Sequence, residues 1–297
     1  MRVVRLPAFA KVNLCLHVLG RRADGYHELR TVFQAISLHD TLELELLRQP
    51  RILISADDPT LPTGRENLIW RALAGLRREL GIRCGVRVHL TKRIPLARGL
   101  GGGSSDAATA MIGLLRLVRK KPRKSRLLDW AARLGADVPF FLVGGRALGV
   151  GRGDKVYALR DGPRRAVLVV SPRHAAVSTP AAYRWLGQLT NRSTARKLWC
   201  FCALCWSPRE AGTANAFEPV VFRRYPRLAT IKRALLRAGA AEAALAGSGS
   251  AVFALFPHPA RARRAAQKFP QDHVIIARTL SRDEYQSALW GGLRMAP

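Results

Sequence analysis

The chain has 297 residues, with 50 Lys and Arg side chains against 20 Asp and Glu, and a formal net charge of +30. Its hydrophobic fraction of 48% suits a packed core and excludes wholesale disorder, and its length allows two domains. No stretch reaches the ~20 uninterrupted apolar residues of a membrane-spanning helix. Pro7, Lys11 and Asn13 interrupt the apolar N-terminal run, unlike a signal peptide, so we expect a cytoplasmic protein.

The positive charge suggests a nucleic-acid partner, because clustered Lys and Arg side chains neutralise phosphates. The charge is not clustered, however. Residues 1–150 carry 26 basic and 12 acidic side chains, and residues 151–297 carry 24 and 8. Arginine makes up 41 of the 50 basic residues, a skew that a GC-rich coding bias also produces. The distribution therefore argues against a nucleic-acid partner.

Strand-like and helix-like patterns alternate along the first half of the chain. Alternating apolar residues predict extended chain over 35–46, with a turn at His39 and Asp40, and a strand over 86–90. Apolar residues at helical spacing predict three helices, over 67–80, 107–118 and 125–134. Ser125 is the expected N-cap of the third helix.

The second half follows a polar stretch over 160–165, which we take as a domain boundary. A strongly apolar segment over 166–170 comes next, and the patterns beyond it predict a helix over 227–237 and a strand over 251–256. Strands and helices that interleave without regular spacing favour an α+β fold over a doubly wound sheet. We therefore expect two domains, residues 1–160 and residues 161–297.

The segment 95–105 is rich in glycine and ends in Ser104 and Ser105, directly before a predicted helix. Glycine lets an anion approach the peptide N–H groups, and a helix start offers unpaired donors and a partial positive charge. Serine hydroxyls can contact phosphate or a magnesium ion. A P-loop would place Lys where Ser104 stands, and a dinucleotide fingerprint would place Gly there. The pattern predicts a phosphate site of another kind, with a flexible glycine-rich turn as the alternative.

Polar residues interrupt two apolar segments. Asp137 stands alone in the apolar run 134–142, where it is either a helix cap or turn residue, or a carboxylate directed into a cleft. Lys11 and Asn13 share one face of the predicted strand 7–16, where Lys11 could instead protect a sheet edge.

Three further motifs are open to two interpretations each. Tyr26 and His27 lie in a polar turn and suit contact with a planar ring, or routine turn chemistry. The small-residue loop 246–250 suits tight packing or closure over phosphate. Among the five cysteines, Cys200, Cys202 and Cys205 lack a nearby fourth zinc ligand, so core packing is favoured over a metal site.

Taken in this order, the motifs resemble those of the GHMP kinases, the family of galactokinase and of homoserine, mevalonate and phosphomevalonate kinases. The segments that carry the resemblance are 7–14, 22–27, 99–108, 135–141 and 246–250. The resemblance implies a two-domain α+β GHMP kinase fold. Its N-terminal part would be a ribosomal-protein-S5-domain-2-like α/β sandwich, and its C-terminal part a ferredoxin-like α+β domain.

The resemblance also implies ATP and Mg²⁺ as ligands. In this family the glycine-rich loop and helix start hold the ATP phosphates. The implied loop contacts are Pro95, Leu96, Ala97, Arg98, Gly99, Leu100, Gly101, Gly102, Gly103, Ser104 and Ser105. Ser105 is also the implied magnesium contact, while Asn67 and Lys92 align with positions near the adenine.

The implied reaction is phosphorylation of the 2-hydroxyl of a cytidine diphosphate ester of methylerythritol, in the non-mevalonate route to isoprenoid precursors. Asp137 would take the hydroxyl proton, with Lys11 as its charge partner. The implied substrate contacts are Asn13, Tyr26, His27 and Tyr183.

Two other functions stay open on the sequence alone. A kinase of another small alcohol, such as mevalonate or homoserine, would leave Tyr26 and His27 without a ring to hold. A basic RNA-binding relative without catalysis would have no reason to keep Lys11, Asp137 and the glycine-rich loop together.

Overall fold

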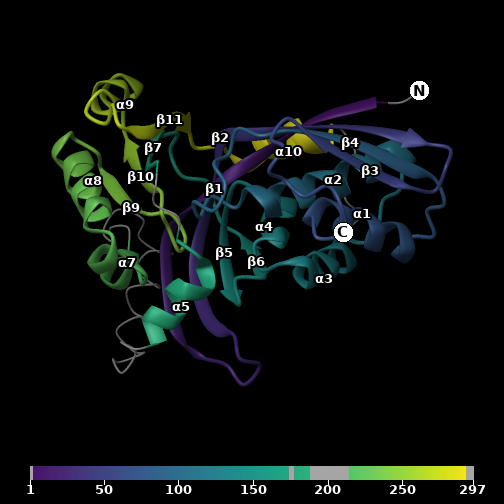
Figure 1. Ribbon diagram of the computed structural model, residues 1–297, viewed down its shortest axis with the longest axis horizontal. Helices are drawn as coiled ribbons and strands as arrows, with labels where there is room; N and C mark the ends of the chain where they lie inside the picture. Colours follow the sequence, from purple (N-terminus) through teal and green to yellow (C-terminus); the bar gives the residue numbers. More distant parts are fainter. Residues whose placement is uncertain (1–2, 174–176, 188–213, 292–297) are drawn as a thin grey trace.

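The computed structural model describes residues 3–173, 177–187 and 214–291. These residues form two sheets with helices packed against them, side by side along the long axis of the molecule (Figure 1). The expected α+β class is therefore confirmed. The expectation for Cys200, Cys202 and Cys205 concerns residues outside the described ranges.

The first sheet is built on a long antiparallel hairpin. Its strands are β1 (Val3–Arg21), β2 (His27–Leu47), β3 (Ile52–Ala56), β4 (Gly85–Thr91), β5 (Arg146–Gly151), β6 (Lys155–Ala158) and β8 (Ala214–Asn215). The main order is β3-β4-β2-β1-β8, and β5 pairs with both β2 and β6. The middle of β1 is buried on both faces, so its polar side chains must find partners inside the protein.

Helices cover one face of this sheet. They are α1 (Leu68–Glu79), α2 (Gly102–Val118), α3 (Lys124–Leu134), α4 (Val138–Val143) and α10 (Arg282–Trp290). Helix α2 lies among the others and is buried from Ser105 to Leu115 (Figure 1). Its small residues let neighbours approach closely: a Cβ added at Gly113 would lie 2.7 Å from the side chain of Leu44.

The second sheet is antiparallel throughout, in the order β11-β7-β10-β9. Its strands are β7 (Ala166–Pro172), β9 (Glu242–Leu245), β10 (Val252–Phe256) and β11 (Asp272–Arg278). The helices of this part are α5 (Thr179–Gly187), α7 (Glu218–Arg224), α8 (Pro226–Arg237) and α9 (Pro259–Ala266). A buried hydrophobic cluster that includes Val12, Ile36, Val167 and Phe253 packs the two sheets against each other.

Three local predictions need correction. No turn occurs at His39 and Asp40, because β2 runs through both residues. The pairing of β2 with β1 shifts register beside them, between Phe9 and Ala10. The second predicted helix begins at Gly102, five residues earlier than expected, because glycines in its first turn hid the start. Ser125 is not an N-cap, since α3 begins at Lys124 after Arg123.

The last helix does not belong with the second sheet. Leu280, Tyr285, Leu289 and Trp290 are part of the same buried cluster as α2 and β2. The expected second domain, residues 161–297, therefore does not describe α10, which returns to the first half of the molecule (Figure 1). No helix in the described ranges is both long and apolar enough to span a membrane.

Candidate functional site

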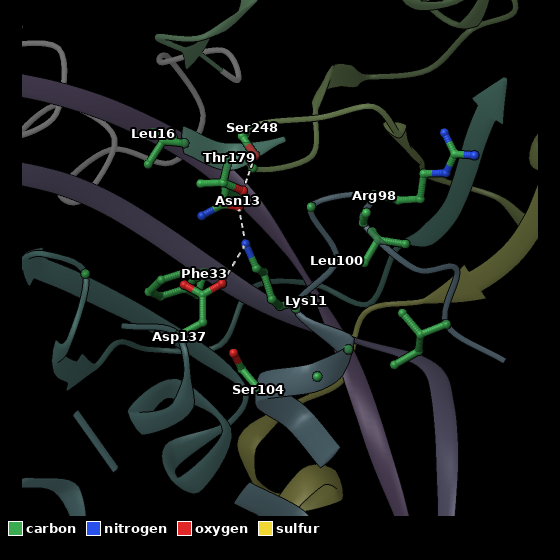
Figure 2. Close-up of a pocket in the computed structure, with 18 of the residues that line it drawn as sticks. Lys11, Asn13, Leu16, Phe33, Arg98, Leu100, Ser104, Asp137, Thr179 and Ser248 are labelled. Carbon is green, nitrogen blue, oxygen red and sulfur yellow. Dashed lines mark hydrogen bonds and ion pairs between the residues drawn. The ribbon is translucent and has the colours of Figure 1, made fainter. Parts of the chain in front are cut away.

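A cavity of about 350 Å³ lies where the two parts of the molecule meet. Its walls come from β1, β2, residues 95–104, the start of α4, the turn between β5 and β6, and the loop before β10. Figure 2 shows Lys11 between Asn13 and Asp137 in this cavity, with Ser104 on the same side as Asp137. Segments from both halves of the sequence thus converge on one site.

The glycines of the loop serve two purposes. Gly99 and Gly101 adopt φ angles of 77° and 75°, and a Cβ at Gly99 would lie 1.9 Å from the carbonyl oxygen of Ala246. A Cβ at Gly103 would meet nothing within 4 Å, although this residue lines the cavity. The first two glycines therefore allow close packing, while the third keeps the approach to the start of α2 open for an anion.

Ser104 and Ser105 point to different surroundings. Ser104 lines the cavity, whereas Ser105 is fully buried and donates its hydroxyl hydrogen to the carbonyl oxygen of Phe9 over 2.6 Å. The expected magnesium contact at Ser105 is thus not supported by the structure. The sequence could not separate the two hydroxyls, because adjacent helical residues differ by about 100° in direction and the starting residue of the helix was unknown.

The central charged pair is Lys11 and Asp137. The Lys11 side chain is 4% exposed, and its ammonium lies 3.4 Å from Oδ2 of Asp137, whose side chain is 35% exposed. Lys11 also donates to Oδ1 of Asn13 over 2.8 Å. Lys11 does not protect a sheet edge, because its side chain is buried and its backbone N–H donates to the carbonyl oxygen of Leu100. Asp137 directly precedes α4 but makes no side-chain cap hydrogen bond, so its carboxylate faces the cavity.

A chain of hydrogen bonds fixes the direction of Asn13. Its Nδ2 donates to the Thr31 hydroxyl over 2.8 Å, and that hydroxyl donates to the carbonyl oxygen of Cys15 over 2.7 Å. The amide oxygen of Asn13 is therefore turned toward Lys11. Thr31 was missed by the sequence reasoning, because a single Thr in a strand carries no pattern of its own.

The two expected adenine-side residues differ. Asn67 does not line the cavity, because it is the N-cap of α1 and accepts from the backbone N–H of Ile69 over 2.8 Å. Lys92 does line it, with its ammonium 2.5 Å from Asp40 and 2.9 Å from Asp106.

The side chains of Lys92, Asp40 and Asp106 are all nearly buried. Burial alone would lower the pKa of Lys92, but the carboxylates of Asp106 and Asp40 outweigh it and raise that pKa. Burial raises the pKa of Asp106 despite the nearby ammonium. A Cβ at Gly102 would lie 3.2 Å from the Lys92 ammonium, so this positive charge sits against the first turn of α2.

Aromatic rings gather at the other end of the cavity. Tyr183 lines it, stacks on His27 with ring centres 4.7 Å apart, and meets Phe217 edge-on at 4.9 Å. Burial, and more weakly the Asp137 charge, raise the pKa of Tyr183. Burial lowers the pKa of His27.

Tyr26 is 56% exposed, and the Arg152 guanidinium lies over its ring at 4.9 Å. Tyr26 and His27 are outside the cavity lining, but each contacts a residue that belongs to it.

The loop before β10 closes the cavity on one side. Gly247 and Ser248 line it, and the Ser248 and Thr179 hydroxyls are 2.8 Å apart. Asn215 donates to the carbonyl oxygen of Gly247 over 2.7 Å. The two interpretations of this loop are therefore compatible, since it packs against Gly99 and also faces the cavity. Sequence reasoning missed Thr179, Asn215 and Arg152.

Known proteins resemble the chain along nearly all of its length. Residues 67–145 match the GHMP kinases N terminal domain, and residues 200–275 match the GHMP kinases C terminal domain. The 4-diphosphocytidyl-2-C-methyl-D-erythritol kinase of Solibacter usitatus is 42% identical over 97% of this chain and 92% of its own length. Its counterpart in Moorella thermoacetica is 41% identical over 94% of this chain and 100% of its own.

Solved structures agree with the sequence matches. A crystal structure of 4-(cytidine 5'-diphospho)-2C-methyl-D-erythritol kinase has a TM-score of 0.77 and 35% identity, and the match covers 93% of this chain and 99% of that one. A homoserine kinase from Cytophaga hutchinsonii also has a TM-score of 0.77, with 95% of each chain covered, but 20% identity. The second likeness concerns the fold alone.

Proposed function

We propose that this chain phosphorylates the 2-hydroxyl of 4-diphosphocytidyl-2-C-methyl-D-erythritol with ATP. The chain belongs to the 4-diphosphocytidyl-2-C-methyl-D-erythritol kinase family of the GHMP kinases. As a GHMP kinase it is a small-molecule kinase of the two-domain fold expected from its motifs. The product would enter the non-mevalonate pathway to isoprenoid precursors. The observation that carries the proposal is the pair Lys11–Asp137, 3.4 Å apart, in one cavity with the glycine-rich start of α2.

The charged pair supplies what phosphoryl transfer requires of a protein. Such a transfer depends on positioning and electrostatic stabilisation more than on covalent help. Asp137, partly exposed to the cavity, would accept the proton of the attacking hydroxyl. Lys11 would stabilise the transferring phosphoryl group, while Asn13 holds the ammonium in place from the opposite side.

The ATP phosphates would lie at the start of α2. The first-turn N–H groups there have no intrahelical partner, and Gly103 leaves the approach free. Lys92 adds positive charge behind the same turn, although Asp40 and Asp106 already engage its ammonium. Its role would therefore be to support the phosphate site from behind rather than to contact adenine.

The residues present fit a magnesium ion held mainly by nucleotide. Mg²⁺ usually keeps several waters and takes one or two protein oxygens beside the substrate phosphates. Within the described residues, no group of three or more His, Cys, Asp or Glu could hold a metal alone. Ser104 and Asp137, which line the cavity near α2, carry side-chain oxygens that suit this ion. When bound, the ion would neutralise part of the negative charge of the phosphates.

The cytidine end of the substrate would lie toward Tyr183, His27 and Tyr26. Planar rings suit stacking on a base, and the His27 nitrogens can bond to its edge. Burial lowers the pKa of His27, which favours the neutral imidazole, the form that both donates and accepts.

The test is ADP release by the purified protein, with ATP and Mg²⁺, in the presence of each of three alcohols. We expect release with 4-diphosphocytidyl-2-C-methyl-D-erythritol and at most background rates with mevalonate and homoserine. Equal turnover of mevalonate or homoserine would replace the proposal with the broader alternative. Phosphorylation at the 2-hydroxyl is verified by ³¹P NMR of the product.

A further inference from the structure

We infer that Arg152 is a substrate-positioning residue, which holds the ring of Tyr26 at the mouth of the cavity. The inference rests on the proposed function, because it assigns Tyr26 to the cytidine end of the substrate. Arg152 lines the cavity and Tyr26 does not, so the contact between them joins the exposed ring to the site.

The Arg152 side chain is fixed by its own turn. The turn between β5 and β6 has Gly151 and Gly153 at φ angles of 72° and 92°, which brings Asp154 back toward Arg152. The Asp154 carboxylate accepts from the Arg152 backbone over 3.2 Å, from Nε over 2.9 Å and from Nη2 over 2.7 Å. Nε and Nη2 share the acceptor Oδ2, and these two bonds restrict rotation of the guanidinium.

A third element limits the remaining freedom of the guanidinium. Nη2 of Arg152 also donates to the carbonyl oxygen of Ala132, near the end of α3, over 3.2 Å. Arg152 is therefore bonded both to its own turn and to α3, one of the helices that cover the first sheet. Its side chain is 29% exposed, so one part remains open to the cavity.

Tyr26 has the opposite character, because its backbone is ordered while its ring is exposed. The Tyr26 carbonyl accepts from the backbone N–H of Arg22 over 2.8 Å, and its N–H donates to Asp24 over 3.1 Å. The ring itself is 56% exposed at the tip of the β1–β2 hairpin. The Arg152 guanidinium covers one face at 4.9 Å, a distance at which a cation attracts an aromatic ring.

The charge arrangement favours positioning over direct phosphate binding. The Asp154 carboxylate already neutralises the Arg152 guanidinium, because Nε and Nη2 both donate to its Oδ2. A phosphate anchor would instead keep its donors free for the ligand. Arg152 can therefore restrict the Tyr26 ring to one orientation without binding the substrate diphosphate. Because the ring is already ordered, substrate binding then loses less side-chain entropy.

The first test compares Arg152→Met with wild type and with Arg87→Met. Arg87 is a matched control, since it also pairs with one carboxylate, Glu45, but lies on β4 away from the cavity. We expect Arg152→Met to raise the KM for the cytidine substrate by about three- to fivefold, with kcat and the KM for ATP within about twofold. Arg87→Met should change none of these constants, and both variants should melt within a few degrees of wild type.

Asp154→Asn separates positioning from a phosphate anchor. It retains the Arg152 charge but removes the ionised partner that restricts rotation of the guanidinium. If Arg152 positions the Tyr26 ring, Asp154→Asn should raise the KM for the cytidine substrate, as Arg152→Met does. A KM that stays unchanged or falls in Asp154→Asn, while Arg152→Met raises it, would assign Arg152 to phosphate binding and overturn the inference.

A double-mutant cycle shows whether Arg152 acts through Tyr26. If it does, Tyr26→Ala combined with Arg152→Met should have the same KM as Tyr26→Ala alone. Full additivity of the two effects would overturn the inference. Wild-type protein that fails to phosphorylate the cytidine substrate would overturn the proposed function as well. Wild-type activity with equal KM in Arg152→Met would overturn this inference alone.

Discussion

The Ser105 hydroxyl donates to the carbonyl oxygen of Phe9 over 2.6 Å, and this bond fastens the first turn of α2 to strand β1. A second tie lies beside it, where the backbone N–H of Lys11 donates to the carbonyl oxygen of Leu100 over 3.0 Å. The glycine-rich loop and the strand that carries Lys11 are therefore held in fixed register. Placement of phosphate relative to ammonium follows from these buried bonds.

Ser104 and Ser105 should respond differently to loss of the hydroxyl. Ser104→Ala should leave the melting temperature unchanged and raise the Mg²⁺ concentration needed for half-maximal rate by about tenfold, because this oxygen faces the cavity. Ser105→Ala should lower the free energy of unfolding by about 1–3 kcal/mol with little change in the Mg²⁺ requirement, because it leaves a buried carbonyl without its donor. Magnesium titrations and urea unfolding of both variants measure this, and a reversed pattern would return the metal to Ser105.

Asp137→Asn should nearly abolish turnover while the protein stays folded. The substitution keeps the shape of the side chain but removes the proton acceptor, whose contribution to rate is typically about 10²–10⁴-fold. The Asp137 side chain is 35% exposed, and the Lys11 ammonium keeps its hydrogen bond to Oδ1 of Asn13, so we expect the fold to tolerate the substitution. Steady-state ADP release and circular dichroism measure the two effects, and activity within a few fold of wild type would remove Asp137 from the chemistry.

Motif spacing predicted the family, the α+β class and much of the cavity wall, because those features depend on short local patterns. Residues 95–104, Lys11, Asn13, Asp137 and Tyr183 all meet in one cavity as expected. Period-two alternation located β4 and helical spacing located α1, and the predictions for β10 and α8 likewise agree within one or two residues of their ends.

What the sequence could not predict depends on contacts between distant segments. The direction of Ser105 depends on where β1 passes, and the burial of Asp40 depends on Lys92, which follows it by 52 residues. Arg152 has no pattern that separates it from the other 40 arginines, since its role follows from a contact with Tyr26. Most of the net charge of +30 likewise has no contact in the described cavity, so the local phosphate site does not account for it.

Thr31→Val should affect catalysis without touching substrate. The Thr31 hydroxyl accepts from Asn13 and donates to the carbonyl oxygen of Cys15, so its loss removes the acceptor of the buried Asn13 amide and one donor to Cys15. We expect a loss of about 1–3 kcal/mol in unfolding free energy and a fall of about tenfold in kcat as Asn13 turns away from Lys11. Thr31→Ser restores the hydroxyl and should recover most of kcat. Equal rates in the Val and Ser variants would show that Asn13 keeps its direction without this bond.

Two glycines of the phosphate loop provide a matched pair. Gly101→Ala should destabilise the protein, because its φ angle is 75° and the added Cβ would lie 2.7 Å from the Phe141 ring. Gly103→Ala has free space and a helical backbone, so it should leave stability unchanged or raise it by ~0.5–1 kcal/mol. Its methyl group nevertheless faces the cavity, and the KM for ATP should rise several-fold. An unchanged KM in Gly103→Ala would place the phosphates elsewhere.

Helix α10 packs in one buried cluster with α2 and β2, and from this packing we predict an effect on stability. Tyr285 is fully buried, and its hydroxyl donates to the carbonyl oxygen of Phe141 in α4 over 2.7 Å. Tyr285→Phe should lower the free energy of unfolding by about 1–2 kcal/mol, whereas Tyr157→Phe, at a ring 56% exposed, should change it by less than about 0.5 kcal/mol. Because α4 begins directly after Asp137, the first substitution should also alter kcat modestly and leave the KM for ATP unchanged. Chemical denaturation and steady-state kinetics of both variants measure these effects. Equal stability of the two variants would mean that the bond from Tyr285 to Phe141 does not stabilise the fold.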